Sequence, residues 1–247
     1  MEIILKKLNG YSGSDIYLMK DEQKTFIRKI NNIERNYNQL IFLKNLGLDV
    51  PLVYKKSNNL LDMEYINGFD MKTYINSNTI QNFLNYIVEL VQKLSQNSLN
   101  KDYTETYYRK LKWMDEYNEF PFTAEQFISS LPKYLPQSFY HGDLTMENIL
   151  YGDKFYLIDC MTTDYDSWVF DLAKLRQDLK VGWFIRHNKN INITNYLSII
   201  DKKIINDYPI ISNNSLLILM LLRVYLYTKP NTYDRDFLLK EIKQLWI

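Results

Sequence analysis

The hydrophobic pattern divides the chain into a first part with the period of strands and a longer second part with the period of helices. In the first part, short segments that contain apolar residues, at 5–8, 16–19 and 25–30, alternate with turn signals. After residue 70, apolar residues recur mostly at three- or four-residue spacing. Runs of the first kind predict strands, and the second spacing predicts helices. We therefore expect a mixed α+β protein whose sheet comes first.

The helical pattern predicts one helix in the first part, at residues 32–46, with an apolar stripe that includes Leu40 and Leu43. In the second part, the same spacing predicts helices at residues 80–94, 101–117, 124–135, 193–208, 214–227 and 234–246. The longest apolar run, residues 216–222, is too short to span a bilayer and indicates a buried helix.

Composition narrows the class of protein. A chain of 247 residues with 46% hydrophobic residues suits one large domain or two small lobes. A net charge of +1 provides no broad basic field for nucleic acid. The single cysteine, Cys160, excludes an internal disulfide and a zinc cluster and fits a reducing cytoplasm. The N-terminus lacks the pattern of a signal peptide. These features favour a cytoplasmic protein without a nucleic-acid or membrane partner.

A β-hairpin is predicted near the middle of the chain. Apolar runs at residues 149–151 and 155–158 flank Gly152-Asp153-Lys154, which is a turn signal. Asn148 and Asp159 lie equally far from the centre of this hairpin, at its open end. Their oxygens can thus hold a hard cation such as Mg²⁺.

Asp143 precedes this hairpin and follows a glycine, Gly142, that allows the backbone to bend. Its carboxylate can accept a proton from an attacking hydroxyl, and its spacing from Asn148 and Asp159 suits phosphoryl transfer. The alternative is a surface hairpin with an incidental Asp and Asn.

A glycine-containing loop lies between the first two predicted strands. Its candidate phosphate-binding residues are Gly10, Ser12, Gly13 and Ser14. Backbone N–H groups of such a loop can cover phosphates, and the serine hydroxyls can add donors. It is not a Walker loop, because no Gly-Lys-Ser/Thr follows. A plain hairpin turn explains the loop equally well.

Arg28 and Lys29 are neighbours on the third predicted strand and therefore point to opposite faces. Only one of the two can face a nucleotide bound beneath the loop. A solvated lysine on an edge strand is the alternative for Lys29.

The stretch around Asp143 resembles the catalytic segment of the aminoglycoside phosphotransferase and choline kinase family, which are small-molecule relatives of the protein kinases. That family reads His-Gly-Asp-x-x-x-x-Asn and then a strand that ends in Ile-Asp, which matches His141 to Asn148 and Ile158-Asp159. Protein kinases have Arg at the position of Gly142 and Asp-Phe-Gly where this chain has Asp159-Cys160-Met161. The resemblance implies a bilobal protein-kinase-like fold, with a nucleotide-binding lobe at residues 1–67 and a helical catalytic and acceptor-binding lobe at residues 68–247.

The resemblance also implies a nucleotide site. It supports the loop at residues 10–14 as the phosphate loop, and Lys29 rather than Arg28 as the lysine that grips the α- and β-phosphates. Residues 60–68 resemble the family's hinge, where the main chain of Glu64 and Ile66 would bind the adenine edge and Met63 would lie behind it.

Support for the catalytic loop is implied in the same way. Asp171, in an Asp-Leu-Ala segment, would accept hydrogen bonds from backbone N–H groups of the loop, and His141 is expected to support it. Glu34 is the carboxylate available to pair with Lys29, although the family's glutamate position falls on Asn36 here. Glu34 is thus either the partner of Lys29 or a solvated residue in the first turn of a helix.

These parts together predict an ATP-dependent, Mg²⁺-dependent kinase that transfers the γ-phosphate to a hydroxyl of a small molecule, such as a sugar, an amino alcohol like choline, or an aminoglycoside. A catalytically inactive nucleotide-binding regulator of the same fold is the alternative. A protein kinase is disfavoured, because no Ala-Pro-Glu segment follows Asp159. Residues 207–247 carry five cationic and four acidic side chains, which favours a metabolic or surface-polysaccharide precursor over an antibiotic as the acceptor.

Overall fold

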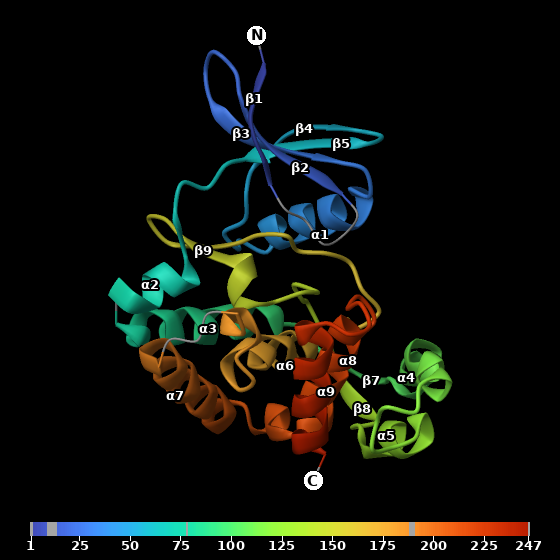
Figure 1. Cartoon of the computed structure of the whole chain (residues 1–247). Coiled ribbons are helices and arrows are strands. Elements are labelled where there is room, and N and C mark those ends of the chain that lie inside the picture. Colours follow the sequence, from blue (N-terminus) through green and yellow to red (C-terminus); the bar gives the residue numbers. More distant parts are fainter. Residues whose placement is uncertain (1, 9–13, 78, 188–190, 247) are drawn as a thin grey trace. The chain divides into compact units, whose positions relative to one another are not determined.

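The computed structural model describes residues 2–8, 14–77, 79–187 and 191–246 (Figure 1). The chain forms two compact units, and each is described by itself. Unit 1 comprises Met1–Ser77 and Glu147–Thr162, and unit 2 comprises Asn78–Met146 and Thr163–Ile247. The boundary expected after Asn67 therefore falls inside the first segment of unit 1.

Within its described residues, unit 1 contains an antiparallel five-stranded sheet in the order β1-β2-β3-β5-β4. The strands are β1 (Ile3–Leu8), β2 (Asp15–Lys20), β3 (Thr25–Ile30), β4 (Val53–Ser57) and β5 (Leu60–Glu64). The turn between β2 and β3 is closed by Asp21, whose carboxylate accepts from the N–H groups of Gln23 and Lys24 at 2.8 Å. Helix α1 (Glu34–Asn45) follows β3 and buries Leu40 and Leu43, as the stripe predicts.

The predicted hairpin is confirmed as β9 (Ile149–Tyr151) and β10 (Phe155–Leu157), which pair antiparallel. The short strand β6 (Phe69–Asp70) pairs with β9, and α2 (Met71–Ser77) follows it. Gly68 allows this approach, because a Cβ there would lie 2.6 Å from the carbonyl oxygen of Tyr151. The ring of Tyr74 packs on Tyr151 with their centroids 4.6 Å apart.

Unit 2 is mostly helical in its described part. Its α-helices are α3 (Ile80–Leu94), α4 (Thr104–Leu111), α5 (Ala124–Ser130), α6 (Trp168–Leu179), α7 (Ile191–Asp207), α8 (Asn214–Tyr225) and α9 (Tyr233–Leu245). The 3₁₀ turns are Lys112–Glu116, Met146–Asn148 at the boundary with unit 1, Trp183–Ile185 and Pro209–Ser212.

Helix α6 lies at the centre of unit 2, in contact with α7 and α8. Residues 169–179 are all buried, and the buried Ser167 begins the helix by accepting a hydrogen bond from the N–H of Val169. In α8, residues 216–222 are fully buried, which confirms the buried helix predicted there. Among the described residues, no helix is long and apolar enough to cross a membrane.

Two predicted helices are wrong at one end. Residues 99–102 form strand β7 (Leu99–Asp102), which pairs with β8 (Tyr134–Gln137). The first helix therefore begins only at Thr104, whose N–H is held by the side chain of Asp102. The second ends at Ser130, since Pro132 disfavours a helical conformation for Leu131, which is extended with ψ 145°.

The described residues form a β-rich N-terminal region and a helical C-terminal region, which confirms the predicted fold class.

Candidate active site

In unit 1, a lysine of β3 meets the aspartate that follows β10. Lys29 is only 2% exposed, and its Nζ lies 2.7 Å from Oδ1 of Asp159. The Asp159 side chain is 41% exposed. Its backbone has a φ of +53°, a left-handed conformation that is uncommon outside glycine. Such strain often marks a functional position.

Asn36 of α1 also holds this carboxylate. Its Nδ2 donates to Oδ1 of Asp159 at 3.2 Å and to the carbonyl of Cys160 at 2.8 Å. Sequence reasoning did not assign Asn36 a role. The available signal was an amide on the face of the helix that carries Leu40 and Leu43, where a buried polar side chain needs a partner.

Glu34 and Lys29 each have another partner in the structure. Glu34 lies 2.8 Å from Nζ of Lys56, in an exposed pair at the start of α1. Arg28 occupies the other face of β3 and donates to both carboxylate oxygens of Asp62, at 2.7 and 2.8 Å. Lys29 is thus the member of the Arg28–Lys29 pair that lies beside Asp159.

The geometry around Asp159 fits a cation ligand. Both contacts described for its carboxylate are made to Oδ1, which leaves Oδ2 on the half-exposed side chain for a bound group. Asn148 lies at the same end of the hairpin, because its carbonyl accepts from the N–H of Ile158 at 2.9 Å. No cluster of three or more His, Cys, Asp and Glu with metal-binding geometry occurs in the described part of the chain.

The expected hinge lies at the end of β5. The N–H of Glu64 donates to the carbonyl of Leu52 at 2.8 Å, and Oε2 of Glu64 accepts from the N–H of Leu52 at 3.1 Å. Met63 is half-buried and Ile66 is buried. These contacts fix the strand before the hinge; the adenine contacts themselves stay predictions.

Of the expected phosphate loop, Gly10, Ser12 and Gly13 lie outside the described residues. Ser14 is buried, and its hydroxyl donates to the carbonyl of Asn31 at 2.9 Å. It therefore joins the start of β2 to the end of β3.

In unit 2, the segment that carries Asp143 is held through its backbone. Oδ1 of Asp171 accepts from the N–H of Gly142 at 2.8 Å, and Oδ2 accepts from the N–H of His141. Gly142 has a φ of +92°, which requires glycine. His141 is fully buried and its Nδ1 accepts from the N–H of Asp143 at 3.3 Å. Burial raises the pKa of Asp171 to about 7, and the two N–H groups oppose that rise.

Two more polar residues of α6 reach the same segment. Lys174 lies 3.4 Å from Oδ1 of Asp143, and Oδ2 of Asp178 accepts from the N–H of Met146 at 2.7 Å. Sequence reasoning missed both. The available signal was spacing: Lys174 and Asp178 lie three and seven positions after Asp171, and residues at these spacings share one face of a helix. Polar residues on one stripe of an otherwise apolar helix predict buried partners.

The charges around Asp143 favour its ionised form. Burial alone would raise the pKa of this carboxyl, but the cations of Lys174 and Arg223 outweigh it, and the net shift is downward. Arg223 of α8 donates to the carbonyl of Gly142 at 3.1 Å and lies over the ring of Tyr165, 5.0 Å from its centroid.

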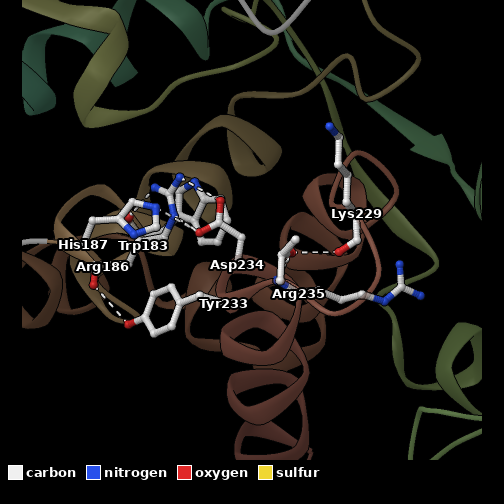
Figure 2. A network of polar contacts seen from close by, with 8 residues as sticks. Trp183, Arg186, His187, Lys229, Tyr233, Asp234 and Arg235 are labelled. Carbon is white, nitrogen blue, oxygen red and sulfur yellow. Dashed lines mark hydrogen bonds and ion pairs between the residues drawn. The ribbon is translucent and has the colours of Figure 1, made fainter.

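A separate polar network surrounds the start of α9 (Figure 2). Asp234 accepts from Nε of Arg186 at 2.8 Å and lies 3.0 Å from Nε2 of His187. The hydroxyl of Tyr233 donates to the carbonyl of Arg186 at 3.0 Å, and the guanidinium of Arg186 stacks on Trp183. The pKa of Asp234 lies below its usual range, and the hydrogen bond from the Arg186 side chain is the largest cause.

Unit 1 thus holds a buried lysine beside a half-exposed aspartate, and unit 2 holds a carboxylate-bearing loop that α6 supports. Residues 8–186 match the family model described as the phosphotransferase enzyme family, abbreviated APH. The chain belongs to this family. The predicted membership is thereby confirmed.

Solved structures share this fold. The chain is similar to a thermostable mutant of the aminoglycoside phosphotransferase APH(4)-Ia, with a TM-score of 0.68, 8% identity, and 99% of this chain and 94% of that chain covered. An ethanolamine kinase of Plasmodium vivax is similar with a TM-score of 0.60 and 12% sequence identity. The match covers 98% of this chain and 82% of that chain. A protein assigned as a fructosamine-3-kinase of Haemophilus somnus 129PT is similar with a TM-score of 0.58 and 19% sequence identity. The match covers 98% of this chain and 90% of that chain. No curated protein sequence matches the chain.

These relatives are protein-kinase-like phosphotransferases that act on small molecules, and the chain has their fold. Its family is one of phosphotransferase enzymes.

Proposed function

We propose that the protein is a cytoplasmic kinase that uses ATP and Mg²⁺ to phosphorylate a hydroxyl group of a small molecule. The observation that carries this proposal is the Asp143 carboxyl group, 3.4 Å from Nζ of Lys174 in a loop that α6 supports at three backbone N–H groups. Family membership supports a catalytic role for this loop, and a carboxylate that stays ionised can accept a proton from a hydroxyl.

The nucleotide half of the proposal rests on unit 1. Lys29 is the candidate for the phosphates, together with the loop at residues 10–14, and the main chain of Glu64 and Ile66 is the candidate for adenine. A buried lysine can neutralise phosphate charge. One of the similar structures, a mutant of APH(4)-Ia, is a ternary complex with ADP and hygromycin B. That complex supports a nucleotide as the ligand of this fold.

Asp159 and Asn148 are the candidates for the metal. The unused Oδ2 of Asp159 and the side-chain oxygen of Asn148 are hard donors of the kind that Mg²⁺ prefers, and phosphates and water commonly complete such a site. When bound, Mg-ATP would supply the transferred phosphate and the charge neutralisation. The chain itself would align the acceptor hydroxyl and accept its proton at Asp143.

The ion pairs of Asp164 and Asp166 favour an acceptor compound without net positive charge. Asp164 and Asp166, the first two carboxylates after Asp159, already have cationic partners. Asp164 bonds Arg109 and Lys110, which lower its pKa to about 2, and Asp166 bonds Lys101. A polycationic acceptor would have to displace these cations, so a neutral or anionic hydroxyl compound such as a sugar is the better candidate.

The test is a panel of neutral, anionic and cationic hydroxyl compounds with purified protein, Mg-ATP and a readout of ADP. We expect acceptor-dependent turnover with the neutral or anionic compounds. Asp143→Asn should lower turnover roughly 100- to 10,000-fold, the range for loss of a general base, and should spare nucleotide binding.

Asp236→Asn, an exposed change on α9, is the matched control and should leave turnover unchanged. Normal transfer by Asp143→Asn would refute the role of Asp143. Binding of Mg-ATP without transfer to any member of the panel would instead favour a non-catalytic nucleotide-binding regulator.

A further inference from the structure

Lys174 is a buried lysine of α6, the helix whose Asp171 and Asp178 side chains hold the backbone of the loop that carries Asp143. Its side chain is 7% exposed, and its Nζ contacts Oδ1 of Asp143 at 3.4 Å and Oε1 of Gln177 at 3.2 Å. Burying an ammonium group is costly unless it is paired. Burial lowers the pKa of Lys174, and the carboxylate of Asp143 opposes that shift and offsets part of the penalty.

The neighbours of Lys174 on the same face determine where Asp143 lies. Asp171 holds the N–H groups of His141 and Gly142, one turn before Lys174, and Asp178 holds the N–H of Met146, one turn after it. The backbone is therefore fixed on both sides of Asp143. Lys174 of the same helix contacts the Asp143 side chain itself.

The charged groups that face Asp143 do not act equally. Lys174 and then Arg223 favour the ionised carboxylate, and His141 does so more weakly. The nearby Asp171 has the opposite effect on the local charge, because carboxylates disfavour one another's ionisation. Arg223 is engaged with the Gly142 carbonyl and the Tyr165 ring, so the direct ion pair is that of Lys174.

We propose that Lys174 is a positioning residue for phosphoryl transfer, which holds the Asp143 carboxylate in place and in its proton-accepting form. This inference rests on the proposed role of Asp143 as the base. Lys174 acts through Asp143, whereas the phosphate-binding role belongs to Lys29 in unit 1. Loss of Lys174 should therefore change proton transfer and leave nucleotide affinity intact.

The direction of the pH effect follows from the charges. The pKa of Asp143 lies below its ordinary value with Lys174 present. Without the cation, burial would dominate and raise that pKa. The acid limb of the pH–rate profile would then move to higher pH, and activity would be lost first at low pH and recovered at high pH.

The experiment titrates Asp143 directly, by NMR of protein labelled with ¹³C at the aspartate carboxyl carbons, with Asp143→Asn used to assign the signal. Lys174→Met should raise the pKa of Asp143 by about one unit or more, the size expected for loss of a close opposite charge. The acid limb of kcat/KM should shift by the same amount, a roughly tenfold loss on that limb per unit, while Mg-ATP affinity stays within about twofold. Lys174→Arg should restore most of both.

Lys180→Met, an exposed change at the end of the same helix, is the matched control and should leave both titrations unchanged. Lys174→Gln serves as a second variant if Lys174→Met does not fold, as judged by circular dichroism. An unchanged Asp143 titration in a folded Lys174 variant would overturn the inference.

The two proposals fail separately. If the wild-type protein transfers no phosphate, the proposed function fails, yet the NMR titration still decides whether Lys174 sets the ionisation of Asp143. If the wild type is active and the Lys174 variants keep its pH profile, only the role of Lys174 is wrong.

Discussion

The protein contains two pairs of a buried lysine and a partly exposed aspartate, one in each unit. In unit 1, Lys29 and Asp159 are 2.7 Å apart, with side chains 3% and 41% exposed. In unit 2, Lys174 and Asp143 are 3.4 Å apart, with side chains 7% and 32% exposed. The two pairs have the same chemistry, but their surroundings differ.

In unit 1, side chains hold the carboxylate directly, because Lys29 and Asn36 both donate to Oδ1 of Asp159. In unit 2, side chains of α6 hold the backbone around Asp143, and Lys174 of that helix contacts the carboxylate. The first arrangement fixes one oxygen and leaves the other for a ligand, as a metal site requires. The second fixes the backbone and favours the charge of the group that we propose as the proton acceptor.

The largest effect should come from Asp159→Ala. This change removes the proposed metal ligand and leaves the buried Lys29 without its anionic partner. Phosphoryl transfer should fall about 1,000-fold or more, because charge neutralisation by a metal ion is worth several kcal/mol in such reactions. Mg-ATP binding should weaken, and calorimetric titration with ATP in the presence and absence of Mg²⁺ measures that loss.

The control for this change is Asp153→Ala, in the turn of the same hairpin, where the aspartate only accepts from the hydroxyl of Tyr156 at 2.9 Å. Its affinity for Mg-ATP should match the wild type. If Asp159→Ala retained a normal dependence of ATP affinity on Mg²⁺, the two lysine–aspartate pairs would not differ in function as proposed.

A second effect concerns stability and its dependence on pH. Asp171 is buried, and its folded pKa of about 7 lies above the ordinary value for Asp. The folded state then binds more protons than the unfolded state, so this residue's contribution to stability is present in full below about pH 4 and falls as the pH rises to about 7. Each pH unit in that window corresponds to at most about 1.4 kcal/mol.

Asp171→Asn should remove that slope, as measured by urea unfolding at a series of pH values. The variant should also be less stable at acidic pH, because an amide cannot match both oxygens of the carboxyl group and an unsatisfied buried N–H costs about 1–3 kcal/mol. Asp207→Asn, a largely exposed site on α7, is the control. The same slope in Asp171→Asn and the wild type would show that another group titrates in that window.

Local patterns predict the backbone of the candidate site. The turn at residues 152–154 and the apolar runs beside it define the hairpin, and Gly142 marks the bend before Asp143. The period of two along β3 separates Arg28 from Lys29, and the structure has them on different partners. These features depend on neighbours in sequence, and a single sequence contains them.

Partners far apart in sequence explain what was missed. Asn36 meets Asp159 across 123 positions, and no local pattern indicates which polar group lies opposite a buried amide. Lys101 pairs with Leu135 in the β7–β8 ladder, which converts the start of a predicted helix into a strand. In both cases a tertiary contact decides the outcome, while periodicity indicates only that a face is buried.

The smallest effect should come from Glu34→Ala, and it tests how the Lys29 pair is built. Glu34 contacts Lys56 in an exposed pair, which is worth at most about 1 kcal/mol. Turnover and the free energy of unfolding should therefore stay close to wild type. Asn36→Ala, two residues further along α1, should lower turnover more, because it removes a donor to Asp159 and to the Cys160 carbonyl.

The comparison of these two variants decides between two arrangements of Lys29. A larger loss of turnover in Asn36→Ala supports the arrangement in which Lys29 and Asn36 share Asp159. A larger loss in Glu34→Ala, measured in the same assay, would mean that Lys29 exchanges Asp159 for Glu34 during turnover. In that case Lys29 would alternate between Asp159 and Glu34. The Lys29–Asp159 pair would then resemble the Lys174–Asp143 pair only in the conformation of this structure.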